Sequence, residues 1–414
     1  MEQYLKLFKT QADYESASDK PTVSHIVEEV EVIMPEKIDY ENEYLTFTAI
    51  DDCKFKYGYS SGYSYYSLDG GNTWTYLRYN TETPLVRSGE KIMWKSYSMT
   101  SGGFPILFFS SGKYKAEGNI LSMQYADDFI GQTTMGSSTR YCSFREGIVD
   151  AENLVLPCLT LGDSACNSMF FYATDLVTAP KVLPATTIGV ATYNQMFDGC
   201  TSLVNLPKIE ATTLTGMQSF HCMFSNCTSI TETPDLPMTS LTQQQCYWQM
   251  FAGCTSLRKV KNLPATVLSS SCYKEMFKGC TSLEIVPDLK AEIINDNSYS
   301  GMFSGCTSLV NAPKIEATGM TGSWNCSEMF EECTSLETAP ELLSKRVTAR
   351  GYDRMFKDCT NLKYIKCHAE TFDTYALAGW VQNVSASGTF VKKANVNYSS
   401  GISGIPEGWT IENI

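Results

Sequence analysis

One eight-residue pattern recurs along the chain, with Met-Phe at its start, Cys at its fifth position and Leu or Ile at its eighth, as in MFSGCTSL at 302–309. The first copy, MFFYATDL, is degenerate and has alanine in place of the cysteine. The copies begin at Met169, Met196, Met223, Met250, Met276, Met302, Met329 and Met355. Their successive steps are 27, 27, 27, 26, 26, 27 and 26 residues. A period this constant over eight units is typical of a solenoid, in which each turn of chain packs on the turn before it.

The rest of each unit is also regular. An apolar or small residue follows the last motif position by three residues, another follows by six, and a proline usually lies between them, as with Ala312, Pro313 and Ile315. We interpret this as a short extended stretch that ends at the proline, which has no N–H to donate. The segment before each Met-Phe, such as SSCYKE at 270–275, predicts either a short helix or a turn.

The Phe-x-x-Cys-x-x-Leu spacing, here Phe303, Cys306 and Leu309, resembles the BspA-type leucine-rich repeat family. The resemblance covers residues 145–367, and the unit here is longer than is usual in that family. It implies a leucine-rich-repeat solenoid of about eight turns. It implies little about function, because one fold supports many functions.

The cysteines and phenylalanines of the motif recur in the same slots, so we expect each set to form a column inside the coil. Cysteine suits such a place because it is a small, often buried residue with a weak S–H donor. Disulfides between neighbouring turns remain an alternative on distance grounds, although an odd number cannot pair completely. Zinc is disfavoured because the chain has no paired C-x-x-C and only three histidines. The two columns are Cys200, Cys227, Cys254, Cys280, Cys306, Cys333 and Cys359, and Phe197, Phe224, Phe251, Phe277, Phe303, Phe330 and Phe356.

Composition excludes several classes of function. The formal net charge is -13, so we expect no nucleic-acid partner, because phosphate binding needs a basic surface. No run of 18 apolar residues occurs, so we expect no membrane insertion. The first 20 residues are charged throughout, so we expect no secretory signal peptide.

The sequence suggests four regions in a mainly β chain with short helices. Residues 1–44, with a helix start at Thr10 and strand-like VSHIVEEVEVIM at 23–34, are either a flexible tail or an N-terminal docking module, which we favour. Residues 45–127 alternate in hydrophobicity and predict a β-sandwich-like domain. Residues 128–367 are the solenoid, including an N-terminal capping turn. Residues 368–414 are a C-terminal cap, in which 371–384 predicts a helix, GTFVKK a strand, and Trp380 and Trp409 cover the last coil.

Residues 67–74, SLDGGNTW, resemble the Asp-box, S-x-D-x-G-x-T-W, of sialidase propellers and many extracellular β proteins. The resemblance implies a hairpin in which Asp69 accepts hydrogen bonds from the turn and Trp74 packs beneath it, with Ser67 and Gly71 completing the motif. Only one copy occurs, so it predicts no propeller, and no arginine triad accompanies it. We therefore interpret it as a structural hairpin.

No catalytic motif is present. The three histidines stand in no recognised motif, and no nucleophile elbow, P-loop, zinc-protease or dinucleotide pattern occurs. A residue repeated seven times is a packing residue rather than a catalytic one, so we expect a non-enzyme without cofactor or metal. Positions that follow the motif leucine vary freely, which suits either a binding surface or a solvated face. The candidate ligand face is Trp248, Trp324, Arg258 and Lys259, whose aromatic members either stack on sugar rings or pack between turns.

The order of regions resembles structural proteins of phages and prophages of gut bacteria. This resemblance implies a head or tail fibre of the virion, anchored to other virion proteins through residues 1–44 and contacting a host surface receptor or glycan. Fibre symmetry suggests a homotrimer. Such a protein assembles in the host cytoplasm, where free thiols persist, and is extracellular after lysis. A bacterial surface adhesin with leucine-rich repeats and a carbohydrate-active enzyme are the alternatives.

Overall fold

The computed structural model describes residues 39–58, 63–97, 106–135 and 142–414. The chain divides between Asp39 and Tyr40 into two units, of which the second spans residues 40–414. The expected docking module at 1–44 therefore lies outside the described residues except for its last six. The described part contains one short α-helix, α2 (Ser122–Tyr125), and one 3₁₀ turn, η1 (Ala126–Asp128), among many strands, which confirms the predicted mainly β class. Among the described residues, no helix is long and apolar enough to cross a membrane.

Two sheets form the first part of the second unit. The larger has the strand order β10-β7-β1-β5-β3-β4, with β11 also paired to β7, and the smaller has the order β2-β6-β9. They pack through aromatic side chains, because Phe47 of β1 meets Phe55 of β2 and Phe108 of β6 at ring-centroid distances of 5.3 and 4.9 Å. The strands are β1 (Leu45–Ala49), β2 (Phe55–Gly58), β3 (Tyr63–Ser67), β4 (Thr75–Leu77), β5 (Lys91–Tyr97), β6 (Ile106–Ser110), β7 (Tyr114–Asn119), β9 (Cys142–Phe144), β10 (Ile148–Asp150) and β11 (Leu154–Val155).

The sheets continue into the repeats without a separate boundary. Strands β10 and β11 pair in parallel with β7, while the ring of Phe144 in β9 stacks between Phe108 and Phe170 at 5.8 and 5.2 Å. The amide of Phe144 donates to the carbonyl of Met169 at 2.7 Å. The segment expected to be an irregular capping turn thus already carries the interior side chain and the hydrogen bond of a repeat. We call residues 142–384 the repeat array.

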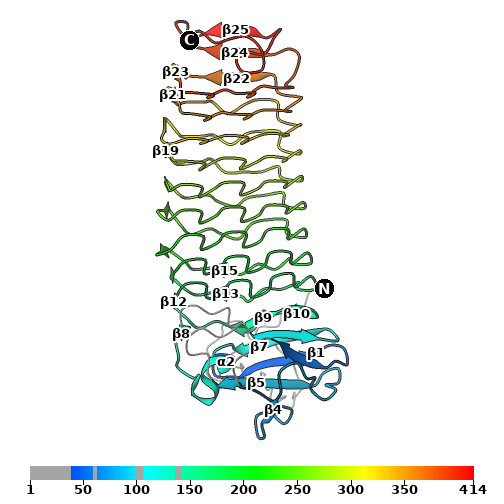
Figure 1. Ribbon diagram of the computed structural model, residues 1–414. Coiled ribbons are helices and arrows are strands. Elements are labelled where there is room, and N and C mark those ends of the chain that lie inside the picture. The colour runs from blue at the N-terminus through cyan, green and yellow to red at the C-terminus, as the bar shows by residue number, and fades with distance from the viewer. Residues whose placement is uncertain (1–38, 59–62, 98–105, 136–141) are drawn as a thin grey trace, which may run out of the picture. The chain divides into compact units, whose positions relative to one another are not determined.

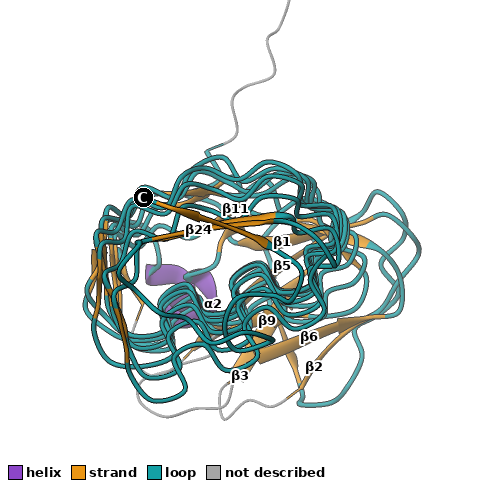
Figure 2. Cartoon of the chain, turned by 90° about the horizontal axis from the view of Figure 1, so that it is seen from above, coloured by secondary structure: helices purple, strands orange, loops and turns teal. Residues whose placement is uncertain are grey.

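Successive repeats of the array pair in parallel at a separation of 25 to 27 residues, as in Thr187 with Thr213 and Ser240 with Val267 (Figure 1). Seen from above, the coils overlie one another (Figure 2). The second residue of most of these two-residue strands is Leu, Ile or Val and is buried. Strand β8 (Thr134–Met135) precedes the array and pairs in parallel with its first two-residue strand that follows β11. The two-residue strands of the array from that one on are β12 (Thr160–Leu161), β13 (Val182–Leu183), β14 (Thr187–Ile188), β15 (Lys208–Ile209), β16 (Thr213–Leu214), β17 (Ser240–Leu241), β18 (Val267–Leu268), β19 (Ile293–Ile294), β20 (Gly319–Met320), β21 (Arg346–Val347) and β23 (Thr371–Phe372).

The segment that leads into each Met-Phe is a series of turns, so the short-helix alternative is wrong. Every fourth residue has a left-handed backbone, with φ of 60° at Gln245, 54° at Gln249 and 74° at Gly253. Along this segment, successive amides alternate between an acceptor in the same repeat and an acceptor in the next repeat. Those of Met250 and Cys254 donate to carbonyls three residues back, whereas that of Phe251 donates to Met276 of the next repeat at 2.9 Å. Because every second amide joins neighbouring repeats, an α-helix cannot form here.

The last repeats differ from the expectation in one element. Residues 371–384, expected to be a helix, consist of β23 followed by turns. The amide of Phe356 donates to Trp380 at 2.8 Å, just as that of Phe330 donates to Met355 at 2.9 Å, so Trp380 takes a methionine slot. The expected strand at 388–393 is confirmed as β24. The final parallel sheet contains β22 (Tyr364–Cys367), β24 (Thr389–Lys392) and β25 (Thr410–Asn413).

Candidate functional site

The motif phenylalanines form one continuous column inside the repeat array. Adjacent rings from Phe197 to Phe356 lie 5.3 to 5.8 Å apart between centroids and are nearly parallel, at 2° to 18°. All seven side chains have 0% exposure. The column therefore packs the interior and presents nothing to a ligand.

The motif cysteines form a second column beside the rings. Each thiol donates to the carbonyl of the phenylalanine one repeat before it, at 2.9 to 3.2 Å, as in Cys254 to Phe224 at 3.0 Å. All seven are free thiols, and the described residues contain no group of three or more potential metal ligands. Burial raises the pKa of Cys254 and that of Cys333 to about 12. The thiols therefore stay protonated at neutral pH and act as buried donors.

A third set of aromatic rings lies three residues before the motif methionine in six of the eight repeats, with Cys166 and Cys326 at that position in the other two. The sequence analysis did not predict it as a set. Tyr247, Tyr273 and Tyr299 are buried and stack at 6.0 and 6.1 Å. Tyr352 stacks on Trp380 at 6.1 Å. These rings pack between repeats and are not available to sugars. The signal was present in the sequence, because aromatic residues recur at that fixed offset.

The Asp-box residues form a closed hairpin turn between β3 and β4. The Asp69 carboxylate accepts from the Thr73 amide at 2.9 Å, from the Thr73 hydroxyl at 2.6 Å and from the Ser67 hydroxyl at 2.7 Å. The amide of Gly71 donates to the Ser67 hydroxyl at 2.8 Å. Trp74 lies beside the hairpin with its ring under the Lys95 ammonium, 4.3 Å from the centroid. The Asp69 carboxylate and the Ser67 hydroxyl thus bond mainly within the turn, which is what a local fold element requires.

Replacing Thr73 with valine is expected to raise the pKa of Asp69. The Thr73 hydroxyl is the main reason that this pKa lies at about 2, and the remaining bonds from the Thr73 amide and Ser67 contribute less. Because the pKa is lowered, the hairpin gains stability above the ordinary carboxyl pKa and loses it as the pH falls toward 2. NMR titration of the Asp69 carboxyl measures the change. Thr75→Val, two residues further along the chain and exposed, is the control, and equal pKa values of Asp69 in both variants would refute the assignment.

The four residues of the candidate ligand face do not form one cluster. The Trp248 ring lies 4.8 Å from the ring of His221, tilted by 42°, and its centroid lies 4.9 Å from the Lys274 ammonium. Trp324 is 37% exposed and lies over Arg350 at 4.6 Å. On the segment after the motif leucine, Arg258 pairs with Glu284 at 3.1 Å, and Lys259 pairs with Glu232 at 2.5 Å. The indoles and the cations therefore belong to different stretches of the repeat, and each already has partners.

The sequence analysis did not predict a contact between His221 and its neighbour Cys222. His221 Nε2 lies 3.4 Å from the sulfur of its neighbour Cys222. Burial lowers the pKa of His221 and raises that of Cys222 to about 12, so the pair is neutral at pH 7. An activated nucleophile needs the opposite shift of the thiol. The contact is thus a neutral one.

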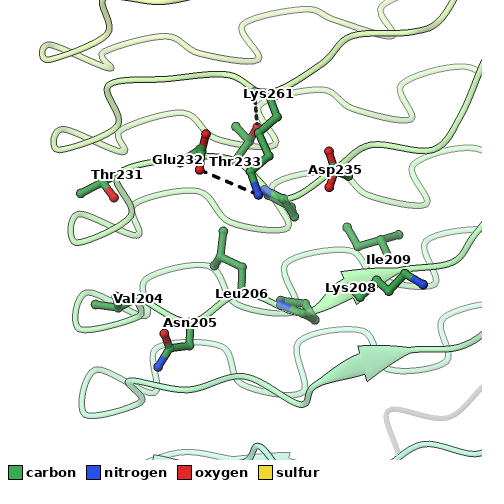
Figure 3. Close-up of a pocket in the computed structure, with 12 residues that line it drawn as sticks. Val204, Asn205, Leu206, Lys208, Ile209, Thr231, Glu232, Thr233, Asp235 and Lys261 are labelled. Carbon is green, nitrogen blue, oxygen red and sulfur yellow. Dashed lines mark hydrogen bonds and ion pairs between the residues drawn. The ribbon is translucent and has the colours of Figure 1, made fainter. Parts of the chain in front are cut away.

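A groove opens between two consecutive repeats (Figure 3). Its volume is about 460 Å³, and we call it the seam groove. Figure 3 shows its lining on two successive coils, the lower carrying Val204 to Ile209 and the upper Thr231 to Asp235. Its charged members are Lys208, Glu232, Asp235 and Lys261.

The seam groove lies where the hydrogen-bond ladder is interrupted. The amides of Val204 and Asn205 donate to Val177 of the repeat before, at 3.0 and 3.1 Å. The amides of Arg258 and Lys259 donate to Thr231 in the same way, at 2.9 and 3.3 Å. Between residues 204–216 and 231–242, all of which the structure describes, no hydrogen bond forms.

Pro237 contributes to this interruption. In the equivalent slot, the amide of Glu210 donates to Leu183 at 3.1 Å and that of Glu316 donates to Leu289 at 3.0 Å. Proline has no N–H, so the bond from this slot to the preceding repeat cannot form. The two coil edges therefore leave backbone donors and acceptors open to solvent or to a ligand.

The groove is ionic and lacks aromatic lining. The Glu232 carboxylate lies 2.5 Å from Lys259 and 3.8 Å from Lys261, and its hydrogen bond with the Lys259 ammonium is the main cause of its lowered pKa. Asp235 and Lys208 are exposed at its rim. Such a groove can bind polar groups through backbone and charged side chains.

No protein-family model, curated protein or solved structure is significantly similar to this chain.

Proposed function

We propose that the chain is a structural protein of a phage virion, a head or tail fibre whose repeat array is a BspA-type leucine-rich-repeat solenoid that attaches to the host surface. The observation that carries the proposal is a constant interior beneath a variable exterior. The same thiol-to-carbonyl bond recurs seven times inside. Outside, the position after the motif leucine is Val204, Thr231, Arg258 or Glu284 in successive repeats. A rigid scaffold with a varied outer row is what recognition of a particular surface requires.

The seam groove supports the same role. It is the place in residues 204–242 where open backbone edges and side chains of both charges meet. Polar grooves of this kind suit contacts with a separate partner, either direct or bridged by water. The buried free thiols are compatible with assembly in the reducing host cytoplasm and release by lysis.

Mass spectrometry of purified phage particles tests the proposal directly. We expect this chain among the virion proteins, in a fixed copy number relative to the capsid. Its absence from particles, together with its recovery from the surface of the bacterium that encodes it, would favour the adhesin instead. Turnover of a host glycan that a single carboxylate substitution abolishes would favour the carbohydrate-active enzyme.

Anchoring through residues 1–44 and assembly as a homotrimer are part of the proposal. Light scattering should give a trimer for the full-length chain and a monomer for a chain that begins at Tyr40. We choose Tyr40 because Asn153 donates to its hydroxyl at 3.3 Å and Glu43 accepts from Asn119 at 2.8 Å, so this stretch belongs to the second unit. Monomers in both cases, in solution and on the particle, would end the trimer hypothesis.

A further inference from the structure

The most exposed aromatic side chain in the described residues is Tyr375, at 65%. It does not project loosely. The Arg350 guanidinium lies over the Tyr375 ring, 5.0 Å from its centroid, and also over the Trp324 ring, 4.6 Å from its centroid. Asp353 fixes Arg350 with an ion pair of 2.9 Å. This cation–π contact holds the Tyr375 ring in place and leaves ring surface open to solvent.

A cavity of about 300 Å³ lies beside this ring, and we call it the tail cavity. Two segments on either side of β24, 372–378 and 397–403, line it. Phe372 and Tyr398 form its apolar wall and meet edge to face at 5.0 Å. Asp373, Asn397 and Ser403 bring polar atoms to the same space.

Several polar groups of the tail cavity remain available. In the part of the chain that the structure describes, neither the side-chain amide of Asn397 nor the Tyr375 hydroxyl forms a hydrogen bond. The Asp373 carboxylate accepts from Arg346 at 3.2 and 2.7 Å and retains further acceptor capacity. Both arginines near the cavity are therefore engaged, Arg346 with Asp373 and Arg350 with Asp353.

This combination selects the chemistry of the ligand. A sugar ring has an apolar C–H face that packs on an aromatic ring and a rim of hydroxyls that donate and accept hydrogen bonds. Phosphate-bearing or carboxylate-bearing ligands need uncommitted cations, and the two arginines here are paired. A cavity of 300 Å³ lies at the small end of ligand sites, about the size for one or two sugar units.

We propose that the tail cavity binds a neutral saccharide unit of a surface glycan, with the sugar stacked on Tyr375 and its hydroxyls bonded to Asn397 and Asp373. The inference rests on the proposed attachment function and adds the ligand class and the place. The stack beneath Tyr375 pre-organises the ring, so binding orders little further structure.

The test uses the full-length protein and an array of oligosaccharides, neutral and anionic, with binding to host cells measured in parallel. Tyr375→Asn is the variant, because its φ of 58° is one that asparagine tolerates. Tyr172→Asn is the matched control, since Tyr172 has a φ of 59° and is 56% exposed on a distant repeat. Unchanged thermal unfolding of both variants checks their fold.

We expect the parent protein to bind a neutral oligosaccharide, Tyr375→Asn to bind it about tenfold or more weakly, and Tyr172→Asn to bind it equally well. Asn397→Ala should weaken binding severalfold. Equal losses in the two tyrosine variants, or preference for anionic glycans, would overturn the inference. Cell binding without any neutral-saccharide binding would overturn the inference but not the attachment proposal. If the protein binds the saccharide but is absent from virions, the virion proposal is overturned, whereas the assignment of the tail cavity as a saccharide site stands.

Discussion

Replacing Phe277 with alanine is expected to lower the free energy of unfolding by about 3–5 kcal/mol. The ring has 0% exposure and stacks between Phe251 and Phe303, at 5.8 Å from each. Alanine would leave a cavity and would end both ring contacts, each of which contributes about 0.5–1.5 kcal/mol beyond burial. Denaturant unfolding followed by circular dichroism measures the change.

Ile293→Ala is the matched control for this experiment. Ile293 lies in the same repeat but is 58% exposed, so its truncation should change stability by less than about 0.5 kcal/mol. Since each repeat contacts its neighbours alone, Phe277→Ala should also broaden the transition by uncoupling the two halves of the array. A loss below about 1 kcal/mol would mean that the column does not hold the repeats together.

Raising the pH from about 9 to 12 is expected to unfold the chain. In an unfolded chain thiols ionise near pH 9, whereas in the folded protein the pKa of Cys254 and that of Cys333 are raised to about 12 by burial. The stability is fully present below pH 9 and is lost as the pH rises, because the unfolded state then releases protons that the folded state keeps. At about 1.4 kcal/mol per pH unit, each such thiol removes about 4 kcal/mol by pH 12.

Domain stability is of the order of 5–15 kcal/mol, so two such thiols reach its lower range. Buried tyrosines act in the same direction, because burial raises the pKa of Tyr57 to about 12. Chemical denaturation at a series of pH values from 7 to 11 measures the effect. A free energy of unfolding that stays constant between pH 8 and 11 would contradict the buried, protonated state of the thiols.

The mainly β class was predictable because the repeat places the same residue types in the same slots. The conformation of the turn segments was not predictable in the same way. Their left-handed positions are occupied by Gln249 and Glu275, residue types that do not indicate positive φ, and glycine marks them only in some repeats, as at Gly253. Hydrogen bonds to the next repeat impose this conformation.

The helix expected at 371–384 does not form, for a related reason. The run TYALAGW favours a helix on propensity, yet the amides of Tyr352 and Arg354 in the preceding repeat use the carbonyls of Ala376 and Ala378, at 2.9 Å each. Tertiary pairing thus overrides local propensity. The positive φ of Gly379, 60°, fits the turn that forms instead.

The candidate sites were partly hidden from sequence reasoning. The sequence shows that Pro237 has no N–H, but it does not show which carbonyl of the preceding repeat would have accepted a hydrogen bond from this position. That depends on the pairing register of the repeats, which only the structure gives. The tail cavity brings Tyr375 together with Asn397, which follows β24, and the sequence alone does not show that the two are neighbours. The predicted ligand face was selected by residue type alone. In the structure, Arg258 and Lys259 form ion pairs with acidic residues of adjacent repeats.

The central claim is that the recurring octet packs the interior of the array with its sulfur atoms protected. Alkylation of the folded protein with an excess of iodoacetamide, followed by peptide mass spectrometry, tests it most directly. We expect the seven motif cysteines to stay unmodified while the chain is folded and to react fully in denaturant. Rapid modification of several of them in the folded chain, or a stoichiometric metal ion released by denaturation, would contradict the account.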